Sequence, residues 1–525
     1  MALRIREMAL SLNETEALLP AKIAAALNLR PDDIRDWKIV RKGIDARRKP
    51  EVLLVYSIEF SCDNEEKLLA EHGPLNLLEA VRPEVAVESR RCSCKPRILV
   101  AGMGPAGLFS ALTLAESGAL VTLVERGAPV ERRLRDVKHF WAGGELDPES
   151  NIQFGEGGAG TFSDGKLSSR ISHPAMRHVL HRLVEFGAPE EILWQAKPHI
   201  GSDRLRSLLI NFRKHLLAIG VDIRFFSRLT GFEMHAGGIS AGQINDSEMV
   251  DCDQLVLALG HSARDTYQML SANRVALEQK PFAIGLRVEH PLELINRIQY
   301  GMERHPRLPA ADYRLAWNDP ETGRGVYSFC MCPGGMVINA ASEPGGIVVN
   351  GMSDFRRDAP HSNSALVVSI SGADFPGTDP LAGIRLQRKW EQAAYLAGGA
   401  GWNAPAQPLL EFLSGRGGRL LSSCQPRVVH ADLTACLPGY VSEALRKALP
   451  HFNRKMQGFI SQDATLIGVE TRTSAPLRIL RDQRGESVSH KGLFPVGEGA
   501  GYAGGIMSAA VDGIRVASGI LQSYS

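Results

Sequence analysis

Three glycines and one glutamate near residue 100 have the types and spacing needed to hold a dinucleotide. The pattern Gly102-x-Gly104-x-x-Gly107 follows an apolar run, Ile98 to Ala101, and Glu125 lies 18 residues beyond Gly107. Gly102 permits a tight turn, Gly104 lets the backbone approach a pyrophosphate, and Gly107 lets a helix pack closely on a strand. An acid at the position of Glu125 can accept ribose hydroxyls. The complete strand–turn–helix–strand–Glu unit predicts a dinucleotide site.

Two further segments match the same glycine pattern. Residues 155–160, GEGGAG, lack a preceding apolar strand and a following helix, so we interpret them as a close-packed loop near the ligand. The run GEGAGYAGG from Gly497 follows a strand, residues 493–496, and precedes a helix, residues 506–521. It lies too near the C-terminus to begin another βαβ unit. We therefore expect one dinucleotide site, assembled from distant segments.

The sharpest candidates for catalysis are Cys330 and Cys332, in the sequence CMC. On a strand, positions i and i+2 face the same side, so both sulfurs could face one cavity and contact or exchange thiols with a substrate. The competing interpretation, two small buried residues inside a strand, is favoured because unpaired cysteines are often buried. His290 is a weaker candidate as a proton donor. A metal site is not expected, because no Cys-x-x-Cys or nearby His spacing supports one.

Three further charged residues are candidates for a structural or an active-site role. Arg287 and Glu289 share one face of the predicted strand GLRVEHP, which favours an internal ion pair between them. Lys166, directly after the glycine loop, is a further candidate for the active site.

The elements around these residues indicate four segments. Residues 1–95 read as a small N-terminal α+β domain, 96–280 as a first dinucleotide-binding part, 281–465 as an inserted substrate or cap domain, and 466–525 as the second dinucleotide-binding part. In the first segment we expect a strand over residues 3–12, a helix over 14–29 capped by Asn13, and paired strands over 37–42 and 52–62. Residues 82–96 read as a linker.

The turn between the paired strands is basic. Residues 38–49 carry six Lys or Arg against one acid, Asp45. A solvated hairpin is favoured there over a patch that binds nucleic acid or a protein partner.

Composition and charge limit the classes of protein to which this chain can belong. The chain has 525 residues, enough for two or three domains, and a net charge of +2, which gives no overall attraction to nucleic acid or anionic membranes. The N-terminus lacks the apolar core of a signal peptide, and no apolar stretch is long enough to span a membrane. The eight cysteines are expected to be reduced. These features predict a cytoplasmic protein without membrane insertion.

The order of these motifs resembles flavoproteins of the glutathione-reductase-like FAD superfamily, the type with two dinucleotide-binding domains. GMGPAGL…VERG is similar to their ADP-binding fingerprint, LVLALG at 255–260 to their mid-chain strand–Gly motif, and LFPVGEGAGYAGGIMSAAVDG at 493–513 to their late flavin motif. In many relatives the acid of the late motif is Asp, so Glu498 departs from them. The strings FGEGGAGTFSDGKL, LGHSARDT, YSFCMCPGG and NGMSDFRRD further resemble a group of uncharacterised bacterial FAD-dependent dehydrogenases.

The resemblance implies an α/β fold with a Rossmann-like FAD-binding domain, an inserted mixed α+β substrate domain and the small N-terminal α+β domain. It implies FAD as the cofactor, and a hydride transferred to or from flavin N5. Arg126, Arg132 and Arg133 are candidates for pyrophosphate or adenosine contacts, with a surface role equally open for each. The implied cofactor-binding residues are Gly102, Gly104, Pro105, Ala106, Gly107, Glu125, Arg126, Arg133, Gly158, Gly160, Thr161, Ser163, Leu229, Ala258, Gly260, Gly497, Glu498, Gly505, Ile506 and Met507.

The expected activity is therefore that of a FAD-dependent oxidoreductase acting on a small molecule that the sequence does not identify. A second complete nicotinamide-binding βαβ unit is absent from the sequence, so NAD(P)H is a candidate only as a transient electron donor. Nucleic acid is not the favoured partner, and the sequence does not indicate an oligomeric state. Two alternatives stay open: a flavin-dependent RNA-modifying enzyme that uses the 38–49 hairpin, and a non-catalytic redox sensor that binds FAD.

Overall fold

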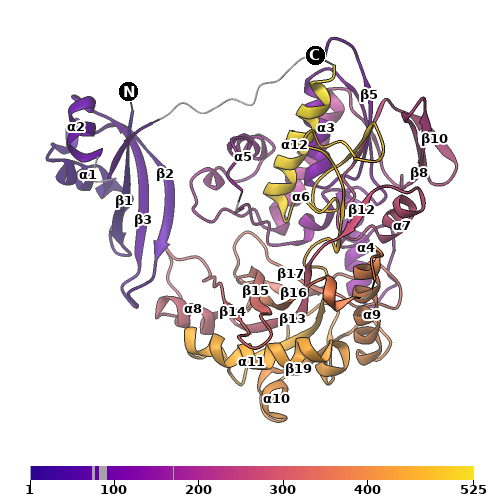
Figure 1. Cartoon of the computed structure of the whole chain (residues 1–525). Helices are drawn as coiled ribbons and strands as arrows, with labels where there is room; N and C mark the ends of the chain where they lie inside the picture. The colour runs from indigo at the N-terminus through magenta and orange to yellow at the C-terminus, as the bar shows by residue number, and fades with distance from the viewer. Residues whose placement is uncertain (1, 74–76, 82–91, 170, 376, 525) are drawn as a thin grey trace.

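A five-stranded parallel sheet with the order β23-β11-β5-β6-β7 forms the centre of the first large region (Figure 1). The computed structural model describes residues 2–73, 77–81, 92–169, 171–375 and 377–524. The strands of this sheet are β5 (Arg97–Ala101), β6 (Leu120–Val124), β7 (Asp222–Arg224), β11 (Gln254–Leu257) and β23 (Leu493–Pro495). This parallel sheet confirms the expected α/β class.

The two faces of the parallel sheet bury alternate residues of its strands. Ile98 and Val100 of β5 contribute to the core beneath the helices, whereas Leu99 and Ala101 contribute to a separate core on the opposite face. The helical side consists of α3 (Pro105–Glu116), α5 (Ala175–Glu185), α6 (Ser202–Ala218) and α12 (Ile506–Leu521). The other side carries β8 (Leu229–His235), β9 (Gly238–Ile244), β10 (Glu248–Asp251) and α7 (Arg264–Ala272). Helix α12, from the end of the chain, packs directly on α3.

A seven-stranded sheet organises the second large region, in the order β14-β15-β18-β13-β21-β19-β20. Its strand pairs are antiparallel except β19 with β20. The strands are β13 (Phe282–Pro291), β14 (Ala316–Asn318), β15 (Gly325–Cys332), β18 (His361–Ile370), β19 (Ala404–Pro408), β20 (Val428–His430) and β21 (Thr465–Glu470). The helices of this region are α8 (Leu292–Tyr300), α9 (Ala382–Ala397), α10 (Leu409–Ser414) and α11 (Gly439–Lys455). Residues of these strands and helices share the largest core cluster.

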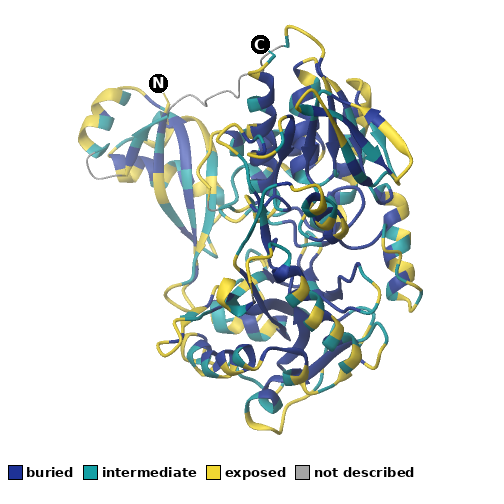
Figure 2. Cartoon of the chain, turned by 45° about the vertical axis from the view of Figure 1, so that its right-hand side comes forward, coloured by how far each residue is buried: buried dark blue, intermediate teal, exposed yellow. Residues whose placement is uncertain are grey.

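Smaller elements connect the two regions. Two short antiparallel sheets pair β12 (Leu277–Gln279) with β22 (Leu477–Ile479), and β16 (Met336–Asn339) with β17 (Val349–Met352). Helix α4 (Val130–Trp141) follows β6 and precedes the long glycine-rich segment. Buried residues fill the interior of both large regions, and exposed residues gather at their outer helices and loops (Figure 2).

The N-terminal segment forms its own four-stranded antiparallel sheet with the order β2-β3-β1-β4. Its elements are β1 (Leu3–Ser11), α1 (Leu19–Leu27), β2 (Arg35–Asp45), β3 (Leu53–Ser61), α2 (Glu65–His72) and β4 (Leu78–Ala80). The expected pairing of strands around the basic turn is confirmed by β2 and β3. Residues 82–91 of the expected linker lie outside the described residues.

The helix expected over residues 14–29 is shorter than predicted. A single 3₁₀ turn, Glu16–Leu18, precedes α1, which begins at Leu19, and Asn13 does not cap it. The reason is Pro20, which lies in the first turn of α1. Proline lacks an N–H and fits there, where the N–H has no partner within the helix. Within the described part of the chain, no helix is both long and apolar enough to cross a membrane.

Candidate functional site

The glycine turn after β5 is closed by contacts that leave no room for side chains. Gly102 has a φ of +105°, and a Cβ placed there would lie 2.3 Å from the carbonyl oxygen of Ala258 at the end of β11. A Cβ on Gly107 would lie 1.9 Å from the oxygen of Gly102. These two glycines therefore let helix α3 and two strands meet at one point. A Cβ on Gly104, by contrast, would meet no atom within 4 Å.

Two helices begin at the same cavity without a capping side chain. Gly104 is the N-cap of α3, and Gly505, with a φ of +112°, is the N-cap of α12. Because glycine has no side chain, neither residue can cap its helix with a side-chain hydrogen bond. Both residues line the cavity. The first N–H groups of a helix have no partner within it and carry partial positive charge. Both helix starts can therefore bind anionic or electron-rich groups of a ligand in this cavity.

The cavity has a volume of about 380 Å³ and lies at the carboxyl ends of the parallel strands. Such ends are where α/β sheets bind ligands. It brings together residues that lie up to 408 positions apart, from Ala101 to Ala509. The sequence-predicted residues that line it are Gly102, Gly104, Pro105, Ala106, Glu125, Arg126, Gly158, Gly160, Ser163, Leu229, Ala258, Gly260, Glu498, Gly505 and Ile506.

The remaining predicted cofactor residues do not line this cavity. Gly107 acts in the packing just described, and Met507 lies in the core beneath the helices. A Cβ placed on Gly497 would lie 2.6 Å from the Cβ of Ala106, so this glycine permits close packing on α3. Thr161 is buried and donates its hydroxyl to the oxygen of Glu156 at 3.0 Å. These residues support the walls of the cavity.

Arg133 is fully buried and does not reach the cavity, which corrects its assignment to pyrophosphate or adenosine. Its guanidinium donates to four main-chain carbonyl oxygens, those of Asn151, Ile152, Gly155 and Glu156. Arginine has five donors in a fixed fork, and here they fix the glycine-rich loop. Burial lowers the pKa of Arg133 to about 10.

Glu125 and Arg126 line the cavity with most of their polar atoms engaged. The carboxylate of Glu125 accepts N–H groups from Met103 at 2.8 Å, and from Gly127 and Gly155 at 2.9 Å each. A carboxylate offers about four lone-pair sites, so about one remains for a ligand hydroxyl. Arg126 donates to Glu149 and Asp265, and its guanidinium lies 4.0 Å from the ring centre of Phe154.

The two cysteines of the CMC sequence do not share a face. Cys330 lines the cavity, whereas Cys332 is fully buried and does not. The pairing of β15 with β18 shifts register between Phe329 and Cys332, and Cys330 has a φ of +44°. Such a bulge breaks the alternation of side chains that the i, i+2 expectation assumed. The Cys332 Sγ donates to the main-chain oxygen of Cys330 at 3.5 Å.

The charges around Cys330 favour its thiolate. A hydrogen bond from Cys332 lowers the pKa of the Cys330 thiol against the opposing effect of burial, and the positive charges of Lys166 and Arg287 lower it further. Lys166 also lines the cavity; its Nζ is buried, lies 3.2 Å from the carboxylate of Asp164 and has no hydrogen-bond partner among the described residues. A thiolate is the nucleophilic and proton-accepting form of cysteine.

Two carboxyl groups of the cavity have pKa values that are raised toward neutral pH. Burial raises the pKa of Glu470 and of Glu498 to about 7 each. Glu470 is fixed by Arg287, whose guanidinium donates to it at 2.8 Å. Acids with raised pKa values in a cleft are typical of functional sites.

Two expectations for strand β13 were wrong. Arg287 does not pair with Glu289, because the neighbouring strand β21 brings Glu470 beside it, while Glu289 accepts hydrogen bonds from Ser422 and Ser423. Residues i and i+2 of a strand are about 6.6 Å apart, farther than a partner on an adjacent strand. His290 is fully buried, outside the cavity, and bonds to the oxygen of Phe459 at 2.7 Å.

Sequence reasoning missed part of the cavity wall. Residues of the second region complete it: Phe329, Asn350, Glu470, Arg472 and Thr473. The polar run from Glu470 to Thr473 begins at the last residue of β21, a strand that is buried along its whole length. That abrupt change from apolar to charged residues was the signal that could have identified them.

Comparisons with known proteins agree with this geometry. Residues 281–473 match the family described as FAD-dependent protein, C-terminal domain-like, and residues 2–61 match a domain of unknown function. An uncharacterised protein of Clostridium beijerinckii is 44% identical over 530 residues, which covers 100% of this chain and 99% of that protein.

Solved flavoprotein structures show weaker similarity. A flavin-dependent brominase is 12% identical with a TM-score of 0.35, covering 81% of this chain and 80% of its own. The L-amino acid deaminase of Proteus myxofaciens is 11% identical with a TM-score of 0.35, covering 85% and 95%. The full-length relative leads to one conclusion: the chain belongs to the same family as the C. beijerinckii protein, and its residues 281–473 match the FAD-dependent protein, C-terminal domain-like family.

Proposed function

We propose that this protein is a FAD-dependent oxidoreductase that passes a hydride between flavin N5 and a small molecule. The observation that carries the proposal is the convergence of two uncapped helix starts and several glycine turns on one cavity that also holds Cys330, Glu470 and Glu498. Glycine-rich helix starts bind phosphates, and groups with shifted pKa values perform proton transfer. Both kinds of group are present in the same cavity.

The residues present fit a dinucleotide. Gly104, Gly504 and Gly505 all line the cavity, and a Cβ on any of them would meet no atom within 4 Å. Because these residues have no side chains, this space is left for a ligand. The start of α3 would hold the pyrophosphate, and the remaining lone pair of Glu125 would accept a ribose hydroxyl. The start of α12, with Gly160 and Ile506 beside it, would lie against the flavin ring.

When bound, FAD would supply two-electron chemistry that no side chain can provide. The chain itself would supply proton transfer. The thiolate of Cys330 is the group best placed to accept a proton from a substrate in the cavity and to return it. Glu470 and Glu498, with pKa values of about 7, can hold or release a proton at neutral pH. Arg287 would fix Glu470 and the main chain of Cys330, to whose oxygen it donates at 2.7 Å.

The electron donor in this proposal is NAD(P)H, or else the substrate itself. Among the described residues, the parallel sheet of five strands is the one parallel sheet with glycine-rich helix starts. A nicotinamide would therefore have to reach the cavity transiently instead of occupying a domain of its own.

The absorbance spectrum of the purified protein, followed by anaerobic reduction with NADH and NADPH, tests the proposal. We expect the bands of bound flavin and their bleaching by a nicotinamide, with reoxidation by an added electron acceptor. Absence of flavin bands after reconstitution with FAD would overturn the proposal. Bleaching without productive reoxidation by any acceptor would instead identify a redox sensor.

A further inference from the structure

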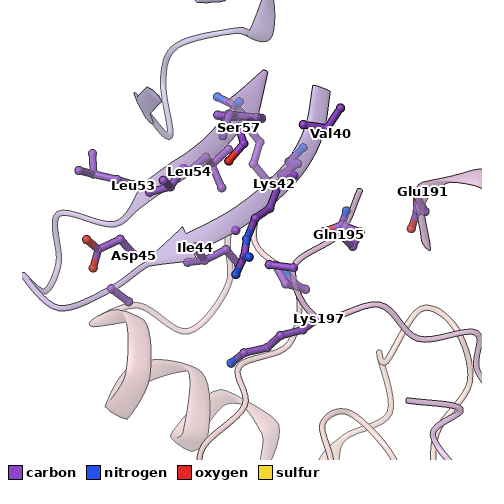
Figure 3. A pocket seen from close by; sticks show the side chains of 18 of the residues that line it. Val40, Lys42, Ile44, Asp45, Leu53, Leu54, Ser57, Glu191, Gln195 and Lys197 are labelled. Atoms are coloured by element: carbon purple, nitrogen blue, oxygen red, sulfur yellow. The ribbon is translucent and has the colours of Figure 1, made fainter. Parts of the chain in front are cut away.

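A second hollow of the molecule is a groove of about 2030 Å³ between the N-terminal sheet and the two larger regions (Figure 3). Strands β2 and β3 form one wall, and segments 191–199 and 355–357 contribute to the other. Lys42 and Ile44 of β2 lie on one side in Figure 3, and Gln195 and Lys197 on the other. We call this hollow the basic groove.

The basic groove concentrates positive charge. Twelve Lys or Arg residues line it against five Asp or Glu residues, a surplus of +7, whereas the whole chain carries only +2. The rest of the molecule is therefore negative. This distribution differs from the sequence expectation of a solvated hairpin, because the basic residues of the 38–49 turn face others that come from remote segments.

Ion pairs on the groove wall reduce this surplus but leave it positive. Among the residues that the structure describes, seven of the basic residues pair with acids, three of which, Glu16, Glu79 and Asp164, lie outside the lining. Counting those three described acids leaves a surplus of +4. Arg41 on β2 and Arg356 on the opposite wall are both exposed and have no ion-pair partner among the residues that the structure describes.

Hydrogen bonds fix the two walls relative to each other. The edge strand β2 bonds to the body through Lys42, whose N–H donates to the oxygen of Trp194 at 2.7 Å and whose oxygen accepts the N–H of Ala196 at 2.8 Å. At the hairpin tip, Lys49 Nζ donates to the oxygen of Ile298 at 2.5 Å. The groove is thus a built feature of the fold, whose two walls are joined by main-chain hydrogen bonds at Lys42. From Lys38 to Asp45 this strand spans about 23 Å.

We infer that the basic groove binds a single-stranded nucleic acid. Its ligand must be anionic, extended and large, because a single small anion would fill only a fraction of the groove. A phosphodiester strand carries one charge per nucleotide, and an arginine without an ion-pair partner, such as Arg41 or Arg356, can match phosphate through two parallel hydrogen bonds. The exposed apolar side chains of Ile44 and Leu53 offer contacts for bases or sugars.

The binding mode would be contact with the backbone rather than base readout. The lining contains few exposed aromatic rings on which bases could stack, with Phe355 already held between His199 and Arg204. Strong dependence on salt and weak dependence on sequence follow from such a mode. This inference concerns a site separate from the flavin cavity and does not depend on the proposed reaction.

Fluorescence anisotropy with labelled 12-nucleotide RNA and DNA of the same mixed sequence tests the inference on the full-length protein. We expect binding at 50 mM salt that weakens as salt rises, with a log–log slope of about −3 for four phosphate contacts. The double variant Arg41→Glu/Arg356→Glu should weaken binding about tenfold and reduce the slope by about 1.4. Arg41→Gln/Arg356→Gln should give a smaller change in the same direction. Preference for RNA or for DNA identifies the source of the strand.

The matched control is Arg135→Glu, an exposed arginine on α4 that has no ion-pair partner in the described part of the chain. Helix α4 lies on the side of the molecule away from the N-terminal sheet. It should bind RNA as the unaltered protein does. Three results would overturn the inference: no binding of either strand at 50 mM salt, equal weakening by Arg135→Glu, or displacement of RNA by polyglutamate as effectively as by unlabelled RNA. The last result would assign the groove to acidic polypeptides.

Discussion

Two sheets form the walls of the cavity that we propose for the flavin, and they differ in how their polar groups are satisfied. On the side of the parallel sheet, Glu125 accepts three main-chain N–H groups and Arg126 is bound by two carboxylates. On the side of the seven-stranded sheet, Cys330 has a lowered pKa and Glu470 a raised pKa of about 7. The first wall consists of glycine turns and of charged side chains whose hydrogen bonds are mostly made within the protein. The second wall carries side chains with shifted pKa values that can exchange protons.

This division separates binding from chemistry. A cofactor that is held permanently needs a rigid wall, and rigidity comes from glycine turns and completed hydrogen bonds. Proton transfer needs groups whose charge state is balanced by burial or by a nearby charge. Glu498 is the exception, because it follows strand β23 of the parallel sheet and yet has a pKa raised to about 7 by burial. It lies where the two kinds of wall meet.

We expect the largest effect, a loss of bound flavin, from adding a side chain to the parallel-sheet wall of the cavity. Gly104→Leu places a side chain in the cavity, where a Cβ meets no protein atom within 4 Å. The fold should tolerate it, but bound flavin should fall about 100-fold, because overpacking a site costs up to about 3 kcal/mol. The measurement is the ratio of flavin to protein absorbance after reconstitution.

A matched control for this variant is Gly439→Leu, at the exposed start of α11. A Cβ there also meets nothing within 4 Å, but Gly439 does not line the cavity. It should keep its flavin. If Gly104→Leu kept its full flavin content, the parallel-sheet wall would not bind the cofactor. The assignment of binding to this wall and of proton transfer to the other would then be wrong.

The sequence predicted the parallel-sheet wall because the role of each residue there depends on near neighbours. Gly102 needs only the strand before it and the helix after it to be recognised. Glu470 and Arg472 could not be predicted in the same way, because the pairing of β21 with β13 decides where they lie. Cys330 depends on a bulge in β15, and the partner of Arg287 depends on the same long-range register. Long-range pairing decides where these residues lie, and the change from apolar to charged residues at the end of β21 is the local signal that the sequence carries for this wall.

Glu498→Gln tests the residue between the two walls. The pKa of Glu498 is about 7 in the folded protein against an ordinary value of 4.5, so the folded state keeps a proton that the unfolded state has lost. Stability of the unaltered apoprotein should therefore fall as pH rises from about 4.5 to 7, by at most about 3 kcal/mol. Gln has no such proton, so the variant should gain stability relative to the unaltered protein over that range.

Urea unfolding of the apoprotein at pH 5 and pH 8 measures this difference. Glu233→Gln makes the same change at an exposed position on β8 and should show no pH-dependent gain. A constant difference between Glu498→Gln and the unaltered protein at both pH values would show that Glu498 is not desolvated.

Thiol labelling tests the wall of the seven-stranded sheet. Because thiolate is the reactive form, Cys330 should react with iodoacetamide at pH 6.5 about tenfold faster than an ordinary thiol. Cys332→Ala removes the hydrogen bond that lowers the pKa of Cys330, so the midpoint of its labelling should move to higher pH. Mass spectrometry of tryptic peptides follows both changes.

Cys436 provides the control for labelling. It is fully buried outside the cavity, and burial raises its pKa to about 12, so it should stay unlabelled in every variant. If Cys330 labelled no faster than an ordinary thiol, or if Cys332→Ala left its midpoint unchanged, the second wall would hold no activated group.

The smallest effect is expected from Arg126→Gln. Its guanidinium lines the cavity, but its donors already bind Glu149 and Asp265, so a direct contact with FAD phosphates would require breaking those pairs. We expect flavin affinity to fall only about two- to fivefold, the range of a partly exposed ion pair, with little dependence on salt. Arg132→Gln, an exposed neighbour on α4 that does not line the cavity, should leave affinity unchanged. A loss above tenfold that shrinks at high salt would mean that Arg126 binds phosphate directly, and that the parallel-sheet wall holds its cofactor with free charge as well as with shape.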